Sequence, residues 1–250
     1  MFLNLKLNHA RRARRFGAIV FVAGVLAAGL ACRSVPPGAP GPDADALAAK
    51  MLKAINYEAW QKNTAAVGWS FRGDHKHFWD RRRDLVEVQW DEYIARFNKN
   101  TLQGRVLQKG RLVQDAGESL ELLAKANAYF VNDAFWLNPL FHIESPGVQL
   151  SLVGERSLKV DFSSGGVTPG DTYVFHTDEN GLVTEMQLWV SIVPLKGSSA
   201  TFENYAVSET GVKSARLYDY LVTIDIGDVK MYAKYPAAGG DDRFAELLAN

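Results

Sequence analysis

The spacing of apolar residues changes along the chain, and each change predicts a different kind of element. Between Leu47 and Ile55 apolar residues recur three or four positions apart, which is the spacing of one helical face. This segment predicts a first helix that ends near Trp60. Residues 33–45 before it hold four prolines and two glycines, a composition that favours an extended, semi-rigid backbone.

From Ala65 onward apolar and polar residues alternate, which predicts strands with one buried face. Short segments rich in Gly, Asp and Asn separate these strands and are typical of turns. Sequential strands joined by tight turns pair antiparallel, so the pattern predicts a meander. Its clearest strands are residues 67–71, 86–90 and 93–97.

A second helix is predicted after Asp115. Asp115 and Glu118 have the spacing of a capping box, and apolar residues continue at helical spacing to Val131. Pro139 is expected to end any helix here. Residues 135–141 are therefore predicted to form an aromatic-rich connection.

The second half of the chain returns to the strand pattern. Asn180-Gly181 is a strong hairpin signal, and a two-residue loop at this point fixes which residues of the flanking strands face each other. The predicted cross-strand pairs are Phe175 with Met186, Tyr173 with Leu188, and His176 with Glu185. Further strands are predicted at residues 149–153, 158–162, 201–207 and 218–226.

These elements predict an α+β domain over residues 46–236. We expect a strongly curved antiparallel sheet, an incomplete barrel of about nine to eleven strands, with two main helices on its concave face. Residues 237–250 form a C-terminal tail, in which residues 241–248 could make a short helix.

The N-terminus resembles the signal peptide and lipobox of bacterial lipoproteins. A basic stretch and the apolar run of residues 16–31 precede Cys32, the only cysteine, and that run is too short to span a bilayer. The resemblance implies a signal peptide at residues 1–31 and an acylated Cys32 that opens the tether of residues 32–45. Several acyl chains give stable anchoring. Arg33 after the cysteine favours the outer membrane, facing the periplasm.

Charge narrows the classes of partner. Removal of residues 1–31 takes five of the 28 basic residues and none of the 28 acidic ones, which leaves a net charge of about −5. This balance argues against nucleic acid and against a polybasic hold on anionic lipid. Membrane contact is therefore expected through Cys32 alone, and protein partners are not indicated.

The order of elements is similar to the LolA/LolB-like superfamily of lipoprotein carriers, in which a curved sheet encloses helices and acyl chains. This resemblance implies non-catalytic binding of a lipid or acylated ligand, without a cofactor. The aromatic residues expected to contact it are Trp69, Phe71, Trp90, Phe97, Trp136 and Phe141. Residues 69–75, 79–81 and 164–171 are closest to an uncharacterised group of exported bacterial proteins, which implies no activity.

His75 and His77 are the one cluster with metal-ligand chemistry, because both imidazoles project from the same side of a strand. Asp74 or Asp80 could complete a three-ligand set. A metal-dependent hydrolase that uses His75, His77 and Asp80 is the alternative function. A non-catalytic envelope scaffold is the third possibility. Residues 81–83, three arginines, could bind an anionic headgroup or could protect a strand edge. No catalytic motif is present, and we expect no enzyme activity.

Overall fold

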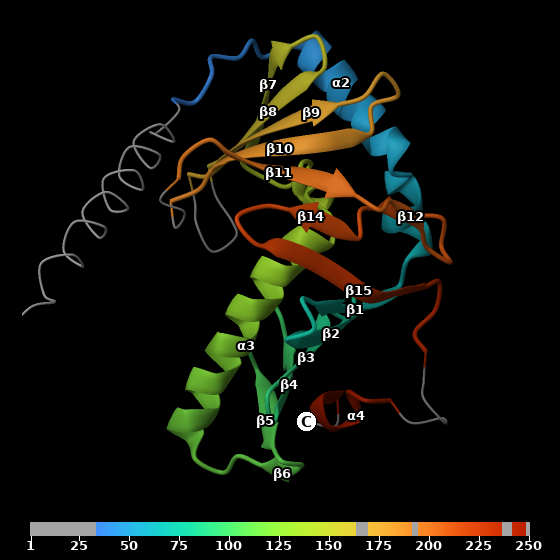
Figure 1. Cartoon of the computed structure of the whole chain (residues 1–250). Coiled ribbons are helices and arrows are strands. Elements are labelled where there is room, and N and C mark those ends of the chain that lie inside the picture. Colours follow the sequence, from blue (N-terminus) through green and yellow to red (C-terminus); the bar gives the residue numbers. More distant parts are fainter. Residues whose placement is uncertain (1–33, 164–169, 192–194, 237–241, 249–250) are drawn as a thin grey trace, which may run out of the picture.

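The computed structural model describes residues 34–163, 170–191, 195–236 and 242–248 (Figure 1). Within these residues the protein is α+β, with one large antiparallel sheet and few helices. The sheet has 13 strands, more than the nine to eleven expected, and it does not close into a barrel. Its order is β6-β5-β4-β3-β2-β1-β15-β14-β11-β10-β9-β8-β7.

The N-terminal half of the sheet is the predicted meander, in which each strand pairs with the next. Alternate residues of these strands face a common core, as the sequence pattern required. The strands are β1 (Ala66–Phe71), β2 (His75–Asp80), β3 (Leu85–Trp90), β4 (Tyr93–Asn98), β5 (Gly104–Gln108) and β6 (Arg111–Leu112).

The C-terminal half begins at the far edge of the sheet and works back to the centre. Its predicted hairpin is present, and the three expected cross-strand pairs are found between β9 and β10. The two-residue loop was wrong, however, because the Asp178 N–H donates to the carbonyl of Leu182 across residues 179–181, and a register shift between Val183 and Glu185 restores the expected pairs. The strands of this half are β7 (Val148–Gly154), β8 (Ser157–Phe162), β9 (Thr172–Thr177), β10 (Val183–Trp189), β11 (Ser198–Glu203), β14 (Leu217–Asp219) and β15 (Thr223–Tyr232). A separate ribbon is formed by β12 (Ala206–Val207) and β13 (Lys213–Ser214).

Two of the predicted strands were wrong in extent. Residues 201–207 do not form one strand, because β11 ends at Glu203 and β12 belongs to the two-stranded ribbon. Residues 218–226 form a hairpin, in which Tyr218 of β14 pairs with Ile224 of β15. The additional short strand β14 accounts for part of the higher strand count, while β12 lies outside the 13-stranded sheet.

The two halves of the sheet are joined by β15, which lies between β1 and β14. Val67 of β1 pairs with Met231, and Phe71 pairs with Ile226, so residues far apart in sequence are adjacent at the centre of the sheet. This pairing makes one continuous sheet from two meanders.

The two main helices pack near the two ends of the sheet (Figure 1). The first, α2 (Pro42–Ala54), packs against β7 and β8, while α3 (Ala116–Leu137) packs against β3, β4 and β5. Both bury residues in the same core cluster as the strands. Short π and 3-10 turns follow them, η1 (Ala59–Asn63) after α2 and η2 (Pro139–His142) after α3.

The helix boundaries differ from the sequence prediction in three places. The first helix starts at Pro42, inside the expected tether, and it ends at Ala54 because Asn56 takes a left-handed backbone with φ 54°. Asp115 caps α3 as predicted, accepting the Glu118 N–H at 2.8 Å. The helix continues to Leu137, however, so most of the expected connection is helical.

On the opposite face of β1–β3 packs Phe244, directly before the four-residue C-terminal helix α4 (Ala245–Leu248). Phe244 is completely buried there with Ala66, Phe78 and Leu85. The expected C-terminal helix is therefore present, and it closes a second, smaller core.

The segment before α2 lies on the edge of the sheet. Ala39 pairs with Leu152 of β7 through backbone hydrogen bonds of 2.9 and 2.8 Å. Of the helices in the described residues, none has the length and hydropathy needed to span a membrane.

Candidate functional site

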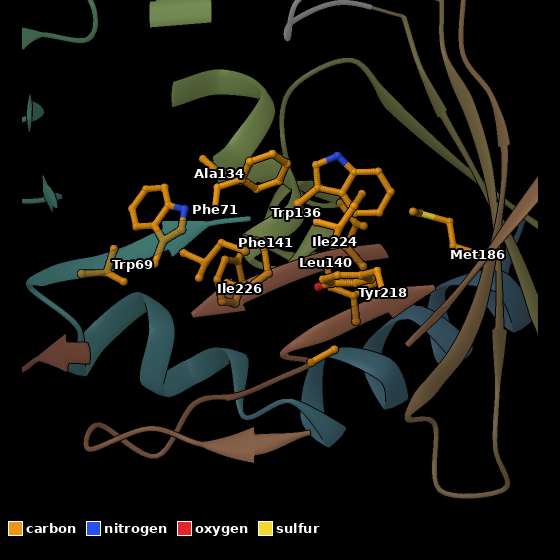
Figure 2. Packing of buried hydrophobic residues seen from close by; sticks show 14 of the residues in the cluster. Trp69, Phe71, Ala134, Trp136, Leu140, Phe141, Met186, Tyr218, Ile224 and Ile226 are labelled. Atoms are coloured by element: carbon orange, nitrogen blue, oxygen red, sulfur yellow. The ribbon is translucent and has the colours of Figure 1, made fainter. Parts of the chain in front are cut away.

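The six aromatic residues expected to contact a ligand all lie in the main core, and none is more than 8% exposed. Figure 2 shows Trp69 and Phe71 of β1 and Trp136 of α3 pointing into one layer between helix and sheet. Phe141 stacks on Trp60 with ring centroids 3.8 Å apart, and Trp136 meets Tyr218 edge-on. These rings fill the space between α3, η2 and the sheet.

Two hollows stand out in the described part of the chain, and neither is lined by any of these six residues. One is an open depression of about 710 Å³ beside β5, β6 and the start of α3, with mainly polar residues around it. The other holds only about 10 Å³ between β4, β5 and α4. Binding of an apolar ligand at the six aromatic residues would therefore require side chains or α3 to move.

A cluster of three side chains that could bind a metal, His75, His77 and Asp133, lies between β2 and α3. The alternation of β2 directs both imidazoles toward α3. His75 Nδ1 and His77 Nε2 each lie 2.7 Å from the same oxygen, Oδ2 of Asp133. The side chains of His77 and Asp133 are 0% and 1% exposed, and that of His75 is 16% exposed.

Asp80 is not part of this cluster, although the sequence suggested it. Its position in β2 has the opposite parity to the histidines, so its side chain lies on the other face of the sheet. There it accepts hydrogen bonds from Arg83 Nε at 2.5 Å and from the backbone N–H groups of Arg82 and Arg83. The carboxylate that does meet the histidines, Asp133, was missed.

A signal for Asp133 exists in the sequence. It follows Ala126 and Phe130 at helical spacing and precedes Leu137 by four positions, so it lies on the buried stripe of α3. A carboxylate on such a stripe must be hydrogen-bonded or paired. Only the distant strand β2 decides which residues provide that pairing.

The environment of the cluster is apolar. The ring of His77 stacks on Trp69 with centroids 4.6 Å apart, and that of His75 lies 4.0 Å from Tyr129. Burial lowers the pKa of His77. The hydrogen bond and charge of Asp133 raise this pKa, and the nearby His75 lowers it further, so that the net shift is downward. The neutral imidazole is therefore favoured.

The hydrogen bonds of the cluster are incomplete. Asp133 also accepts the amide of Asn132 at 2.8 Å, on its other oxygen. Within the described residues, Nδ1 of His77 is buried without a partner, and so are the indole N–H groups of Trp69, Trp79 and Trp90. All three indoles contact Phe130 or Tyr129 of α3. The layer beneath α3 thus contains several unpaired polar atoms.

The three arginines after β2 are occupied by contacts within the protein. Arg81 lies 3.6 Å over the ring of Trp60 and donates to two backbone carbonyls, and burial lowers its pKa to about 10. Arg82 donates to the carbonyl of Lys62, and Arg83 pairs with Asp80 and Asp242. These contacts favour a structural role over capture of an anionic headgroup.

No known protein family matches the chain, and no curated protein is similar to it. Cys32 and residues 164–169 of the glycine-rich loop lie outside the described residues.

Proposed function

We propose that this protein is a non-catalytic lipoprotein of the cell envelope that binds an apolar or acylated ligand between α3 and the sheet. In this proposal Cys32 carries the acyl anchor, and the curved sheet corresponds to the incomplete barrel of LolA/LolB-like carriers. The antiparallel sheet with both main helices in one core supports the comparison.

The observation that carries the proposal is the composition of the layer under α3. It is rich in aromatic side chains, and three of its indole N–H groups have no hydrogen-bond partner in the described residues. A buried unpaired donor costs about 1–3 kcal/mol. Separation of α3 from the sheet would restore hydration of these donors, which offsets part of the cost of exposing the rings.

A ligand chain would then replace side chains of α3 as the cover of Trp69, Trp90 and Phe97. An acyl chain recovers about 0.8 kcal/mol for each buried CH₂, so a chain of ordinary length can replace the apolar contacts that α3 gives up. Binding of this kind needs a moving helix and no preformed cavity.

Photochemical labelling tests the proposal. The full chain is reconstituted in lipid nanodiscs with a photoreactive fatty acid, irradiated and digested. We expect labels on peptides of α3, β1 and β3, and we expect excess unlabelled fatty acid to suppress them. Labels confined to exposed apolar residues outside these elements, such as Val207 and Val222, would contradict binding under α3 and favour a scaffold.

The anchor is tested separately. Mass spectrometry of the membrane-extracted protein should find an N-terminal Cys32 with acyl chains. Cys32→Ala should move the protein out of the mature, lipid-modified fraction. An unmodified Cys32 thiol in the mature protein would contradict the anchor and leave the ligand proposal standing.

The hydrolase alternative is less favoured. Its carboxylate, Asp80, is bound to Arg83 on the opposite face, and the histidines are largely enclosed by aromatic rings. A hydrolytic metal needs an open coordination position that substrate can reach.

A further inference from the structure

We propose that His75, His77 and Asp133 bind one divalent first-row transition-metal ion, with Zn²⁺ as the best match, and that this ion fastens α3 to β2. The site goes beyond the proposed function and does not depend on it, because its three residues already meet without any ligand. A bound ion would oppose the separation of α3 from the sheet that the proposed function requires.

The geometry of the donor atoms fits a small ion. Nδ1 of His75, Nε2 of His77 and a carboxylate oxygen of Asp133 all lie within 4.8 Å of one another. Zinc bonds to His and Asp are about 2.0–2.2 Å long, which keeps tetrahedral ligand atoms roughly 3.3 Å apart. The two nitrogen–oxygen distances of 2.7 Å would therefore lengthen by about half an ångström.

The ligand set is also chemically suitable. Two imidazoles and one carboxylate suit zinc and other borderline divalent ions. The Asn132 amide, which donates to the second oxygen of Asp133, orients the carboxylate as outer-shell partners of metal ligands do. The partly exposed edge of His75 leaves room for a water molecule as a fourth ligand.

Charge supplies an independent argument. Asp133 is almost completely buried, and within the described residues its ion pairs are with these two histidines alone, with no lysine or arginine. An uncompensated carboxylate is costly in an apolar layer. A divalent cation would neutralise it without requiring either imidazole to be charged.

The test is a titration of the full chain in detergent with Co²⁺, after treatment with a chelator. We expect one ion per chain, visible absorption bands of a low-coordinate site, and displacement of Co²⁺ by Zn²⁺. His75→Gln and Asp133→Asn should each weaken binding at least tenfold. His176→Gln is the matched control, because His176 is a half-buried histidine on β9 that bonds Ser157 and should leave binding unchanged.

Folding is monitored in the same samples by circular dichroism. Zn²⁺ should raise the melting temperature of the wild type and of His176→Gln, but not that of Asp133→Asn. Asp133→Asn could lose metal binding simply by failing to fold. His75→Gln is less prone to this, because His75 is the most exposed of the three ligands.

Two results would overturn the proposal. One is a chelated wild-type protein that binds no stoichiometric Co²⁺ at micromolar concentration. The other is Co²⁺ binding that is equal in the wild type, His75→Gln and Asp133→Asn. The first would mean that the cluster is held by hydrogen bonds alone, and the second would place the ion elsewhere.

Discussion

Tyr218 is completely buried in the core, but its hydroxyl has no hydrogen-bond partner within the described residues. Burial also raises the pKa of this phenol well above its usual value. Because an unpaired buried hydroxyl costs about 1–3 kcal/mol, Tyr218→Phe should raise the free energy of unfolding by about 1 kcal/mol. Urea denaturation measures this change.

Tyr205→Phe is the matched control. Its hydroxyl donates to the carbonyl of Val183 at 2.9 Å, so loss of that bond should lower the free energy of unfolding by about 1 kcal/mol. If the two variants lost equal stability, the hydroxyl of Tyr218 would have to be hydrogen-bonded.

Individual site residues were predictable only in part. The period of two correctly placed His75 and His77 on one side of a strand. The same period excludes Asp80 from that side, because it is an odd number of positions away. Asp133 could not be assigned, because its distance from β2 in sequence gives no information about their contact in space.

At the scale of elements, Gly181 illustrates how a turn residue is constrained. Its φ is +85°, and a Cβ would lie 2.8 Å from Cγ of Lys50 on α2. Gly181→Ala should therefore lower the free energy of unfolding by about 1–2 kcal/mol, through backbone strain and crowding of α2. Thermal denaturation measures the loss.

Gly154 at the end of β7 is the control for this substitution. It lacks the positive φ, and the nearest atoms to its Cβ would be at 3.8 Å, an ordinary contact. Gly154→Ala should leave the melting temperature almost unchanged. Equal losses in the two variants would show that the conformation of Gly181 is not the cause.

The stability that the segment before α4 contributes should depend on pH, because Asp242 in this segment pairs with Arg83. Hydrogen bonds from Arg83 lower the pKa of Asp242 from 3.8 to about 2. A lowered carboxyl pKa stabilises the folded state above the unfolded pKa, so this contribution is complete above pH 4 and is lost as the pH falls toward 2. Asp242→Asn should lower the melting temperature at pH 7, and the difference from wild type should shrink toward pH 2.

Glu246→Gln gives the comparison for Asp242→Asn. Glu246 is exposed and pairs with Arg105 at 3.0 Å, so its loss should have little effect at any pH. A constant difference between Asp242→Asn and wild type from pH 7 to pH 2 would contradict the assigned ion pair.

The hairpin of β14 and β15 explains why one element was misread. Tyr218 pairs with Ile224, and residues 220–222 form the turn between them. Because the paired positions differ by an even number, the core-facing residues keep the same parity through the turn. An alternating pattern is therefore unchanged by the reversal, and residues 218–226 read as one strand.

At the scale of the whole molecule, β15 holds the two halves of the sheet together, since it pairs with β1 on one side and β14 on the other. A chain that ends at residue 221 lacks β15. Both halves should then lose cooperative unfolding, because the core-facing residues of β1 and β14 would lose the strand that they pack beside. Differential scanning calorimetry of the truncated chain checks this expectation.

A chain that ends at residue 236 is the control. It lacks α4 but keeps β15, so it should unfold cooperatively at a lower temperature. Cooperative unfolding of the chain that ends at residue 221 would mean that the N-terminal meander is stable without its central neighbour.

The sequence by itself determined the local structure of this protein. Periodicity identified the helices and most strands, and the Asn180-Gly181 turn signal located the hairpin of β9 and β10, because these features depend on neighbouring residues. Only the tertiary structure decided the pairing of β1 with β15, the filling of the aromatic layer and the meeting of His75, His77 and Asp133. These contacts join residues that are distant in the chain, and their energy depends on packing in three dimensions, which no local pattern records.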